Sequence, residues 1–198
     1  MIIKKDIVVF DIETTGFNEY EDDIIEVGLV RFDGETGEVK ERFNELVYTD
    51  KKLSPKIVEL TGITQEMLQE DGKDKEYVKN RMIELCKDAV LVAHNVQFDF
   101  RFLAVQYGIE PKYFYDTLSI SRLEYPEFKN HKLATICQEF NVDLSNAHRA
   151  LHDAEATKDV LISMLDNKPS VAKKYINSIA NSKYGIDYKP KYTRKVFN

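Results

Sequence analysis

Apolar residues occur in short uninterrupted runs in the first half of the chain. The run Ile7 to Phe10 ends at an acidic residue and Ala89 to Ala93 is a second such run, so each is predicted to be a buried strand. Ile24 to Phe32 and Val39 to Tyr48 alternate more loosely on either side of Asp33-Gly34. This arrangement predicts a β-hairpin, because Asp-Gly is typical of a turn between two strands.

Helical spacing of apolar residues becomes frequent from Glu76 onward. The segment Glu76 to Lys87 has the pattern of an amphipathic helix, with apolar residues at Val78, Met82, Ile83 and Leu85. Ser54-Pro55 and Thr64 are typical helix starts and predict two short helices. Further helices are predicted over Gln97 to Tyr107, His131 to Phe140, Ala147 to Leu165 and Val171 to Ala180. Strands followed by helices and short strands predict an α/β fold, with a mixed sheet covered by helices.

The composition is that of a soluble globular domain. With 198 residues, 43% of them apolar and 31% charged, the chain can form one well-packed domain. No stretch reaches the roughly 20 apolar residues of a membrane-spanning helix, and the N-terminal apolar run is too short for a signal peptide. Cys86 and Cys137 lie far apart and outside CxxC spacing, which argues against disulfides and zinc. We therefore expect a cytoplasmic protein.

Charge is distributed unevenly along the chain. From Asn167 to the C-terminus there are 8 Lys or Arg residues and one acid, Asp187, which gives this segment +7. Since the whole chain carries −6, the remainder carries −13. We therefore expect a domain over residues 1–166 and a basic helix and tail over residues 167–198. A body this acidic needs another means of bringing phosphate close, and bound divalent cations would provide it.

Two acidic residues stand at the end of the first predicted strand. Asp11 and Glu13 are two residues apart, so their side chains point to the same face, about 7 Å apart by the rise of a strand. Like charges at the rim of an apolar sheet repel each other and are costly to desolvate. Two metal ions separated by ~3.5–4 Å would compensate them. The alternative, to which we give equal weight, is a strand end at which both carboxylates are hydrated and bind no metal.

Further acidic residues occur near two predicted helix starts. Asp99 follows the strand Ala89 to Ala93 and lies where a helix dipole favours a carboxylate, so by itself it is more typical of a helix start than of a ligand. His148 and Asp153 are separated by about 500° of helical turn, and they share a site only if His148 lies at or before the first turn. Ser145-Asn146 would be a suitable N-cap for such a start.

Taken together, these motifs resemble those of the DEDDh (DnaQ-like) exonuclease family. Asp11 to Gly16 matches the pattern D-x-E-T-T-G, His94 to Asp99 matches H-N-x-x-F-D, and His148 to Asp153 matches H-x-x-x-x-D. Additional similar segments are Leu60 to Thr64, Asp116 to Leu118 and His131 to Leu133. The resemblance extends over residues 7–165. Within the family, the chain is most similar to the proofreading subunit of bacterial DNA polymerase III and to the exonuclease segment of PolC-type polymerases.

The resemblance implies a fold and a reaction. The fold would be ribonuclease H-like, with a central mixed five-stranded sheet flanked by helices. The reaction would be removal of nucleoside monophosphates from the 3′ end of DNA, with two Mg²⁺ or Mn²⁺ ions bound by oxygen ligands. Metal ligation is implied for Asp11, Glu13, Asp99 and Asp153. His148 would be the general base, since an imidazole can accept a proton at neutral pH.

Substrate contacts are also implied by the resemblance. They are expected from Ile12, Thr14, Thr15, Gly16, Asn95 and His148. Gly16 would leave room for the terminal nucleotide, because it has no side chain. A simple turn at Thr14 to Gly16 and a helix cap at Asn95 are the structural alternatives. His94 and His131 are more typical of structural histidines than of catalysts.

Three questions stay open at the level of sequence. The same site could act on RNA or short oligonucleotides, because no residue reveals whether a 2′-hydroxyl is tolerated. The chain could instead be an accessory subunit that binds a DNA polymerase. Its basic tail, with Lys189, Lys191, Arg194 and Lys195, could dock such a partner or could be a solvated end.

Overall fold

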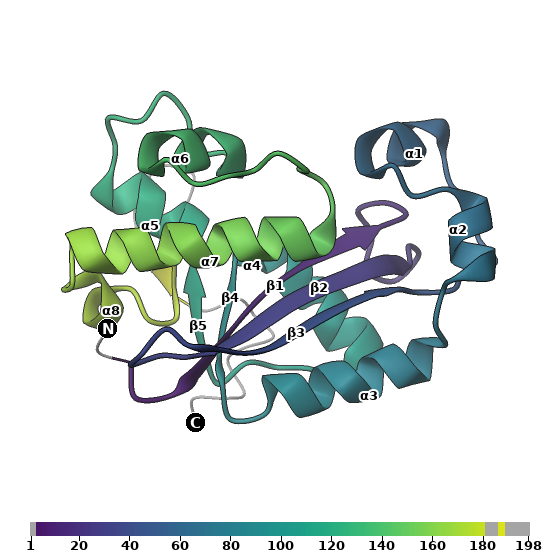
Figure 1. The fold of residues 1–198 in the computed structure, drawn as a ribbon, viewed down its shortest axis with the longest axis horizontal. Helices are drawn as coiled ribbons and strands as arrows, with labels where there is room; N and C mark the ends of the chain where they lie inside the picture. The colour runs from purple at the N-terminus through teal and green to yellow at the C-terminus, as the bar shows by residue number, and fades with distance from the viewer. Residues whose placement is uncertain (1–2, 181–185, 189–198) are drawn as a thin grey trace.

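The structure is a computed structural model that describes residues 3–180 and 186–188. Five strands form one mixed sheet in the order β3-β2-β1-β4-β5 (Figure 1). Their bounds are β1 Asp6–Thr14, β2 Ile24–Asp33, β3 Val39–Leu46, β4 Val90–Ala93 and β5 Tyr113–Asp116. β2 pairs antiparallel with β1 and β3, whereas β4 runs parallel to β1 and β5. The predicted hairpin and the predicted fold class are confirmed.

Helices cover both faces of the sheet (Figure 1). Their bounds are α1 Pro55–Thr61, α2 Gln65–Glu70, α3 Lys75–Cys86, α4 Val96–Phe102, α5 Thr117–Glu124, α6 Leu133–Phe140, α7 Ala150–Asn167 and α8 Val171–Lys174, with a π-helix, η1, over Leu103–Tyr107. The predicted starts at Ser54 and Thr64 are confirmed, because each hydroxyl accepts a hydrogen bond from a backbone N–H in the first turn. Among the described residues, none of the helices combines the length and apolar character needed to cross a membrane.

Alternate residues of β1 pack against different layers of helices. The even-numbered residues from Val8 to Ile12 belong to an apolar cluster with residues of α3 and α4. Ile7 and Val9 belong to a second cluster, on the face covered by α7. Because strand side chains alternate between faces, Asp11 and Glu13 continue the second row. The two acids therefore point to the face of the sheet that α7 covers.

The segment Val171 to Ala180 is only partly helical, so the prediction of one helix over its whole length is wrong. α8 ends at Lys174, and Ser178–Ala180 forms β6, which pairs with β7, Ile186–Tyr188. Asn177 ends the helical path, because its N–H donates to the Phe114 carbonyl and its side-chain oxygen accepts from the Phe114 N–H, both at 2.8 Å. These contacts with β5 override the local helical spacing.

The basic tail mostly lies outside the described residues, including all four of the cationic residues on which the docking hypothesis depends. The boundary expected at residue 166 stays a prediction. Residues just beyond it nevertheless pack against the body, since Val171 and Tyr175 are buried in the cluster under α7.

Helix α3 offers a test of the fold. Met82 is fully buried, whereas the neighbouring Ile83 is 44% exposed, although both belong to the predicted apolar face. We expect Met82→Ala to lower the free energy of unfolding by about 2–5 kcal/mol, because it leaves a cavity. Ile83→Ala should lower it by less than about 1 kcal/mol. Urea denaturation measures both values, and equal losses would contradict this placement of α3.

Candidate active site

Three elements bring four acids together at one end of β1. Asp11 and Glu13 lie on β1, Asp99 lies on α4, and Asp153 lies in the first turn of α7. Figure 1 shows the tip of β1 beside the start of α7. Asp11 is close enough to the other three carboxylates for the charge of each to raise its pKa. The structure thus places the four predicted acids in one cluster.

Asp99 reaches this cluster because β1 is longer than its neighbour β4. In the described structure β4 pairs with β1 only from Ile7 to Val9, so the later residues of β1 have no strand beside them on that side. α4 begins shortly after β4, and the buried carboxylate of Asp99 accepts a hydrogen bond from the backbone of Ile12. The helix therefore supplies an acid where the sheet leaves one edge of β1 unpaired.

His148 and Asp153 meet at the start of α7. The helix begins at Ala150, so the N-cap predicted at Ser145-Asn146 is wrong. His148 precedes the helix, which is the condition for His148 and Asp153 to share one site. His148 adopts a left-handed backbone conformation with φ of 65°, and its N–H donates to Asp153 Oδ2 at 3.1 Å. One ring nitrogen of His148 and one carboxylate oxygen each of Glu13 and Asp153 all lie within 4.8 Å of one another.

Burial raises the pKa of all four acids, and repulsion from neighbouring carboxylates adds to the effect. Burial raises the pKa of Asp11 well above its ordinary value, and repulsion from the neighbouring carboxylates raises it further. The pKa of Glu13 is raised to about 8, first by burial and then by the charges of Asp153 and Glu26. Burial is also the main cause of the raised pKa values of Asp99 and Asp153. The cluster therefore favours the binding of positive charge.

The donor atoms fit a divalent cation. Asp153 Oδ1 is buried and has no hydrogen-bond partner within the described part of the chain, although Oδ2 of the same carboxylate is bonded. A buried carboxylate oxygen without a partner is costly, and a cation removes that cost. Carboxylate oxygens are the ligands that Mg²⁺ and Mn²⁺ prefer.

The turn that follows β1 is held by Asp22. The carboxylate of Asp22 accepts hydrogen bonds from Thr15 Oγ1 at 3.2 Å and from the Asn18 N–H at 2.9 Å. A Cβ atom at Gly16 would lie 2.3 Å from Asp22 Oδ2, so a side chain at this position would displace the carboxylate that holds the turn. On this side of Gly16, the space that was expected to admit a terminal nucleotide is filled by Asp22. Contact between substrate and Thr14 or Thr15 stays a prediction.

Asn95 occupies the N-cap position of α4, but its side chain makes no capping hydrogen bond. The backbone N–H groups of Asn95 and Val96 donate instead to Asp116 Oδ1, at 2.9 and 3.3 Å. Asp116 is buried at the end of β5, so a neighbouring strand caps the helix that carries Asp99. Asn95 is thus the N-cap residue, as the structural alternative has it, but its own side chain does not supply the capping hydrogen bond.

His94 and His131 are engaged in contacts within the fold. His94 Nδ1 lies 2.9 Å from Thr117 Oγ1, and Nε2 lies 3.0 Å from the His131 carbonyl oxygen. His131 Nδ1 lies 2.7 Å from Ser121 Oγ. Both nitrogens of the His94 ring are used in this way, which supports the structural role expected for it.

Sequence reasoning missed three acids that hold the site in place: Asp22, Glu26 and Asp116. Asp22 occurs in a polar segment that shows no distinct pattern, and Asp116 was noted only as part of a segment similar to the family, without a role. Glu26 did carry a signal, because it is the one charge within the apolar run Ile24 to Val30. An acid inside a predicted buried strand requires a partner, and here the partner is Arg149.

A groove of about 880 Å³ adjoins the acids. His148 and Asp153 line the groove, and the rest of its wall includes Asn95, Phe128, Lys129 and Lys132. Both lysines are exposed. The groove therefore joins the acidic cluster to a positively charged wall.

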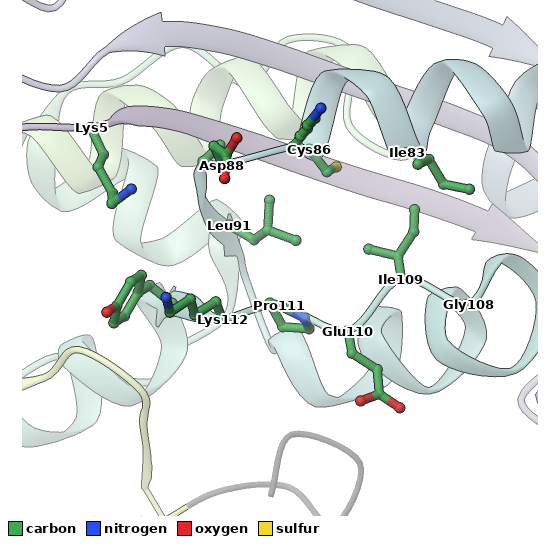
Figure 2. A pocket seen from close by; sticks show the side chains of 13 residues that line it. Lys5, Ile83, Cys86, Asp88, Leu91, Gly108, Ile109, Glu110, Pro111 and Lys112 are labelled. Carbon is green, nitrogen blue, oxygen red and sulfur yellow. The ribbon is translucent and has the colours of Figure 1, made fainter. Parts of the chain in front are cut away.

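A separate pocket of about 360 Å³ lies at the opposite end of the sheet, where the parallel strands begin (Figure 2). Its lining includes Lys5, Asp88 and Lys112, which precede the parallel strands β1, β4 and β5. Lys5 and Glu13 are about 26 Å apart by the rise of a strand. Since ligands of α/β sheets bind at the carboxyl ends of the strands, this pocket is distinct from the acidic site.

Comparison with known proteins agrees with this geometry. The model of a family described as Exonuclease, of the RNase T type, matches residues 8–161. The chain is 44% identical over 164 residues to the PolC-type DNA polymerase III of Bacillus subtilis (strain 168), covering 80% of this chain and 11% of that protein. It is 37% identical over 181 residues to the PolC-type DNA polymerase III of Caldanaerobacter subterraneus subsp. tengcongensis, covering 89% and 13%. The chain thus spans about a tenth to an eighth of these relatives.

Solved structures with the same fold are also exonucleases. A zinc-bound E. coli ExoI–ssDNA complex superposes with a TM-score of 0.73 at 19% identity, covering 86% of this chain and 42% of that one. Exonuclease X in complex with 5′ overhanging duplex DNA gives 0.69 at 24% identity, covering 85% and 96%. These similarities show the fold, which is the expected ribonuclease H-like one. The family match, which covers most of the chain, establishes by itself that the chain is an enzyme of the RNase T-type exonuclease family.

Proposed function

We propose that the chain is a 3′–5′ exonuclease that hydrolyses DNA to nucleoside monophosphates with two divalent cations. The observation that carries this proposal is the convergence of Asp11, Glu13, Asp99 and Asp153 beside the ring of His148. Phosphodiester hydrolysis requires an activated water and stabilisation of charge on the attacking and leaving oxygens. A cluster of acids that binds cations, next to one imidazole, provides for both.

The four acids would hold the cations. Bound there, two divalent cations would lower the pKa of water and stabilise charge on the phosphate oxygens. Asp153 would use Oδ1, because its Oδ2 is already bonded to the His148 N–H. Asp99 would keep its hydrogen bond to the backbone of Ile12, which fixes its carboxylate relative to Asp11 on the same strand.

His148 would accept the proton of the attacking water. Its side chain is exposed at the mouth of the site, yet a ring nitrogen remains within 4.8 Å of the carboxylates of Glu13 and Asp153. The hydrogen bond from its own N–H to Asp153 fixes the backbone that carries the ring. An imidazole in this position can take a proton at neutral pH and release it to solvent.

The terminal nucleotide would contact the end of β1 and the turn that follows it, from Ile12 to Gly16, and also Asn95. Phe17, directly after this turn, is 76% exposed. Its ring packs edge-on against that of Phe98, with the two centroids 6.2 Å apart. Exposed aromatic rings bind bases by stacking without strong sequence preference. We therefore assign to Phe17 a contact with a base at the 3′ end.

The strand that leads to the terminal nucleotide would lie in the groove beside the site. Lys129 and Lys132 are exposed on its wall, in a protein whose net charge is −6. Phosphates are attracted to such local positive charge even where the whole protein is acidic. The groove thus provides a path along which successive phosphodiesters would reach the acids.

DNA is proposed as the substrate because the sequence relatives are named as DNA polymerases and two structural neighbours are described as bound to DNA. RNA and short oligonucleotides are the competing substrates, since hydrolysis at the acids does not itself require a deoxyribose. A DNA polymerase is the partner that we propose for the basic tail.

One assay tests the reaction. Single-stranded DNA and RNA of the same sequence, each labelled at the 5′ end, are incubated with the protein and Mg²⁺ or Mn²⁺. We expect a ladder of DNA products that shortens from the 3′ end, and loss of it with Asp11→Asn or Asp153→Asn. If RNA is digested faster than DNA, the substrate is RNA and the proposal of DNA is wrong. No digestion with either metal would contradict the exonuclease activity and favour an accessory role in binding a polymerase.

The raised pKa values predict a pH-dependent stability. Between the ordinary pKa of Glu13, 4.5, and its folded pKa of about 8, the folded chain retains a proton that the unfolded chain releases. Without cations, the free energy of unfolding should therefore fall as the pH rises through this range. Added Mg²⁺ or Mn²⁺ should raise Tm more at pH 8 than at pH 5, because ionised carboxylates bind cations better. Circular dichroism melts measure both effects.

The matched variant for this experiment is Glu13→Gln. It removes one of the titrating groups, so the fall in stability with pH should become smaller. A Tm that does not respond to pH or to cations would show that the carboxylates do not form a cation site.

The role of His148 predicts a large effect on rate. His148→Gln should lower kcat by about 10²–10⁴-fold if the imidazole is the general base. His152→Gln is the control, because His152 lies on α7 but lines a different pocket with Arg42. The rate of this control variant should be unchanged. Equal rates for the two variants would remove the proton-transfer role.

A further inference from the structure

We propose that Glu26 is a positioning residue, which acts with Arg149 to seat the start of α7 against the end of β1. The inference rests on the proposed function, since the groups it positions are His148 and Asp153. It concerns a strand, β2, that contributes none of the proposed metal ligands or substrate contacts.

Glu26 is placed where a carboxylate is unfavourable. Its side chain is fully buried, and its residue pairs directly with Glu13 across the β1–β2 ladder. Residues directly opposite in an antiparallel pair point to the same face, so Glu26 faces α7 as Glu13 does. Its charge also raises the pKa of Asp11, Glu13 and Asp153. A fifth acid adds to the repulsion among the other four, so its own contacts must compensate for it.

Within the described part of the chain, the Glu26 carboxylate bonds to Arg149, the residue before α7, and to Ala150, its first residue. Glu26 Oε1 accepts from Arg149 Nη2 at 2.8 Å and from Arg149 Nε at 3.1 Å. Glu26 Oε2 accepts from the Ala150 N–H at 2.9 Å. Arg149 is the N-cap residue and makes no side-chain cap, so Glu26 satisfies a terminal N–H of this helix from a neighbouring strand. One carboxylate thus binds both the charge and the backbone at the start of α7.

Gly28 allows this close approach. It is two residues after Glu26 on the same face of β2, and it pairs with Asp11. A Cβ atom at Gly28 would lie 2.0 Å from the Leu151 nitrogen and 2.1 Å from the Ala150 carbonyl carbon. Backbone atoms cannot move aside as a flexible side chain can. The start of α7 is therefore seated directly on the strand, with Glu26 as its polar anchor.

Arg149 and Ala150, to which Glu26 is bonded, lie in the sequence between His148 and Asp153, the two residues at the start of α7 that the proposed reaction requires. His148 immediately precedes Arg149, and Asp153 lies three residues after Ala150. His148 and Asp153 are also joined by a hydrogen bond of 3.1 Å. If the contacts of Glu26 were lost, the helix start could shift relative to β1, and misplacement by about 1 Å can cost ~100-fold in rate.

The variant Glu26→Gln tests the proposal. Its amide oxygen can still accept from the Ala150 N–H, but the ion pair with Arg149 is lost. Residues that orient metal ligands typically change metal affinity or activity by about 10–100-fold when replaced. We expect a decrease of this size in kcat, with KM for single-stranded DNA unchanged, and a decrease of this size in Mn²⁺ affinity by calorimetry. Amide hydrogen exchange at residues 149–153 should become faster.

Glu155→Gln is the matched control. Glu155 also lies on α7 and pairs with an arginine, Arg42, at 2.7 Å, but this pair is partly exposed and lines a pocket that contains none of the four acids. Its loss should leave kcat, Mn²⁺ affinity and exchange at residues 149–153 unchanged. A thermal melt of each variant separates positioning from folding, because a merely structural role would lower Tm without changing kcat per folded molecule.

Arg149→Gln and the double variant complete the test. Arg149 is 39% exposed, so it can be hydrated and its replacement should not prevent folding. Since the two residues act as a unit, the double variant should lose little more than either single variant. The proposal is overturned if Glu26→Gln behaves like Glu155→Gln in rate, Mn²⁺ binding and hydrogen exchange. It is also overturned if the loss in the double variant equals the sum of the losses in Glu26→Gln and Arg149→Gln. If the unaltered protein digests no 3′ end, the proposed function fails, while Mn²⁺ binding and exchange still decide the role of Glu26.

Discussion

Repulsion between carboxylates at the end of β1 is the constraint around which this part of the molecule is organised. Asp11 and Glu13 project from one face of a strand, and Asp99 and Asp153 approach from two helices. In the protein alone, burial and repulsion disfavour the ionised form of each acid. The rest of the fold must hold these groups together although their charges oppose it.

The fold holds the acids together through contacts at the starts of the helices that carry Asp99 and Asp153. Asp99 and Asp153 lie in the first turns of α4 and α7, where the positive end of the helix dipole favours a carboxylate. The start of α4 is capped by Asp116 from β5, and the start of α7 is bound by Glu26 from β2. Each helix that carries an acid is therefore anchored by a second acid on a strand. Stability stored in the large apolar clusters on both faces of the sheet offsets the electrostatic cost.

The same electrostatic cost is what makes the cluster suited to its proposed work. A group of acids that is unfavourable alone gains most from a bound cation, so affinity for divalent ions and instability without them have one origin. The neighbouring groove adds what the acids lack, since its lysines attract phosphates that the acids would repel. In the proposed function, the separation of negative and positive charge at one end of the sheet would direct a nucleic-acid strand toward the site through the groove.

Much of the fold follows from local pattern. Apolar runs predicted β1, β2, β3 and β4, and apolar spacing predicted α3, α4, α6 and α7 within a few residues. β5 and α5 were not predicted, because the four residues of β5 are too few to show a pattern. The helix predicted beyond Val171 stops early, since Asn177 is bound by the edge of β5, and nothing in the neighbouring sequence carries that information.

The sequence was sufficient to predict the chemical groups of the candidate site, whereas their arrangement in space was decided by the tertiary structure. Motifs identified Asp11, Glu13, Asp99, His148 and Asp153 because the type of side chain and its spacing are local properties. The sequence could not show that β1 extends beyond β4, that His148 lies before the helix in a left-handed conformation, or that Glu26 anchors Arg149 from 123 residues away. These features depend on which strands pair and in what register, and that choice is made by the free energy of packing the whole core rather than by any one segment.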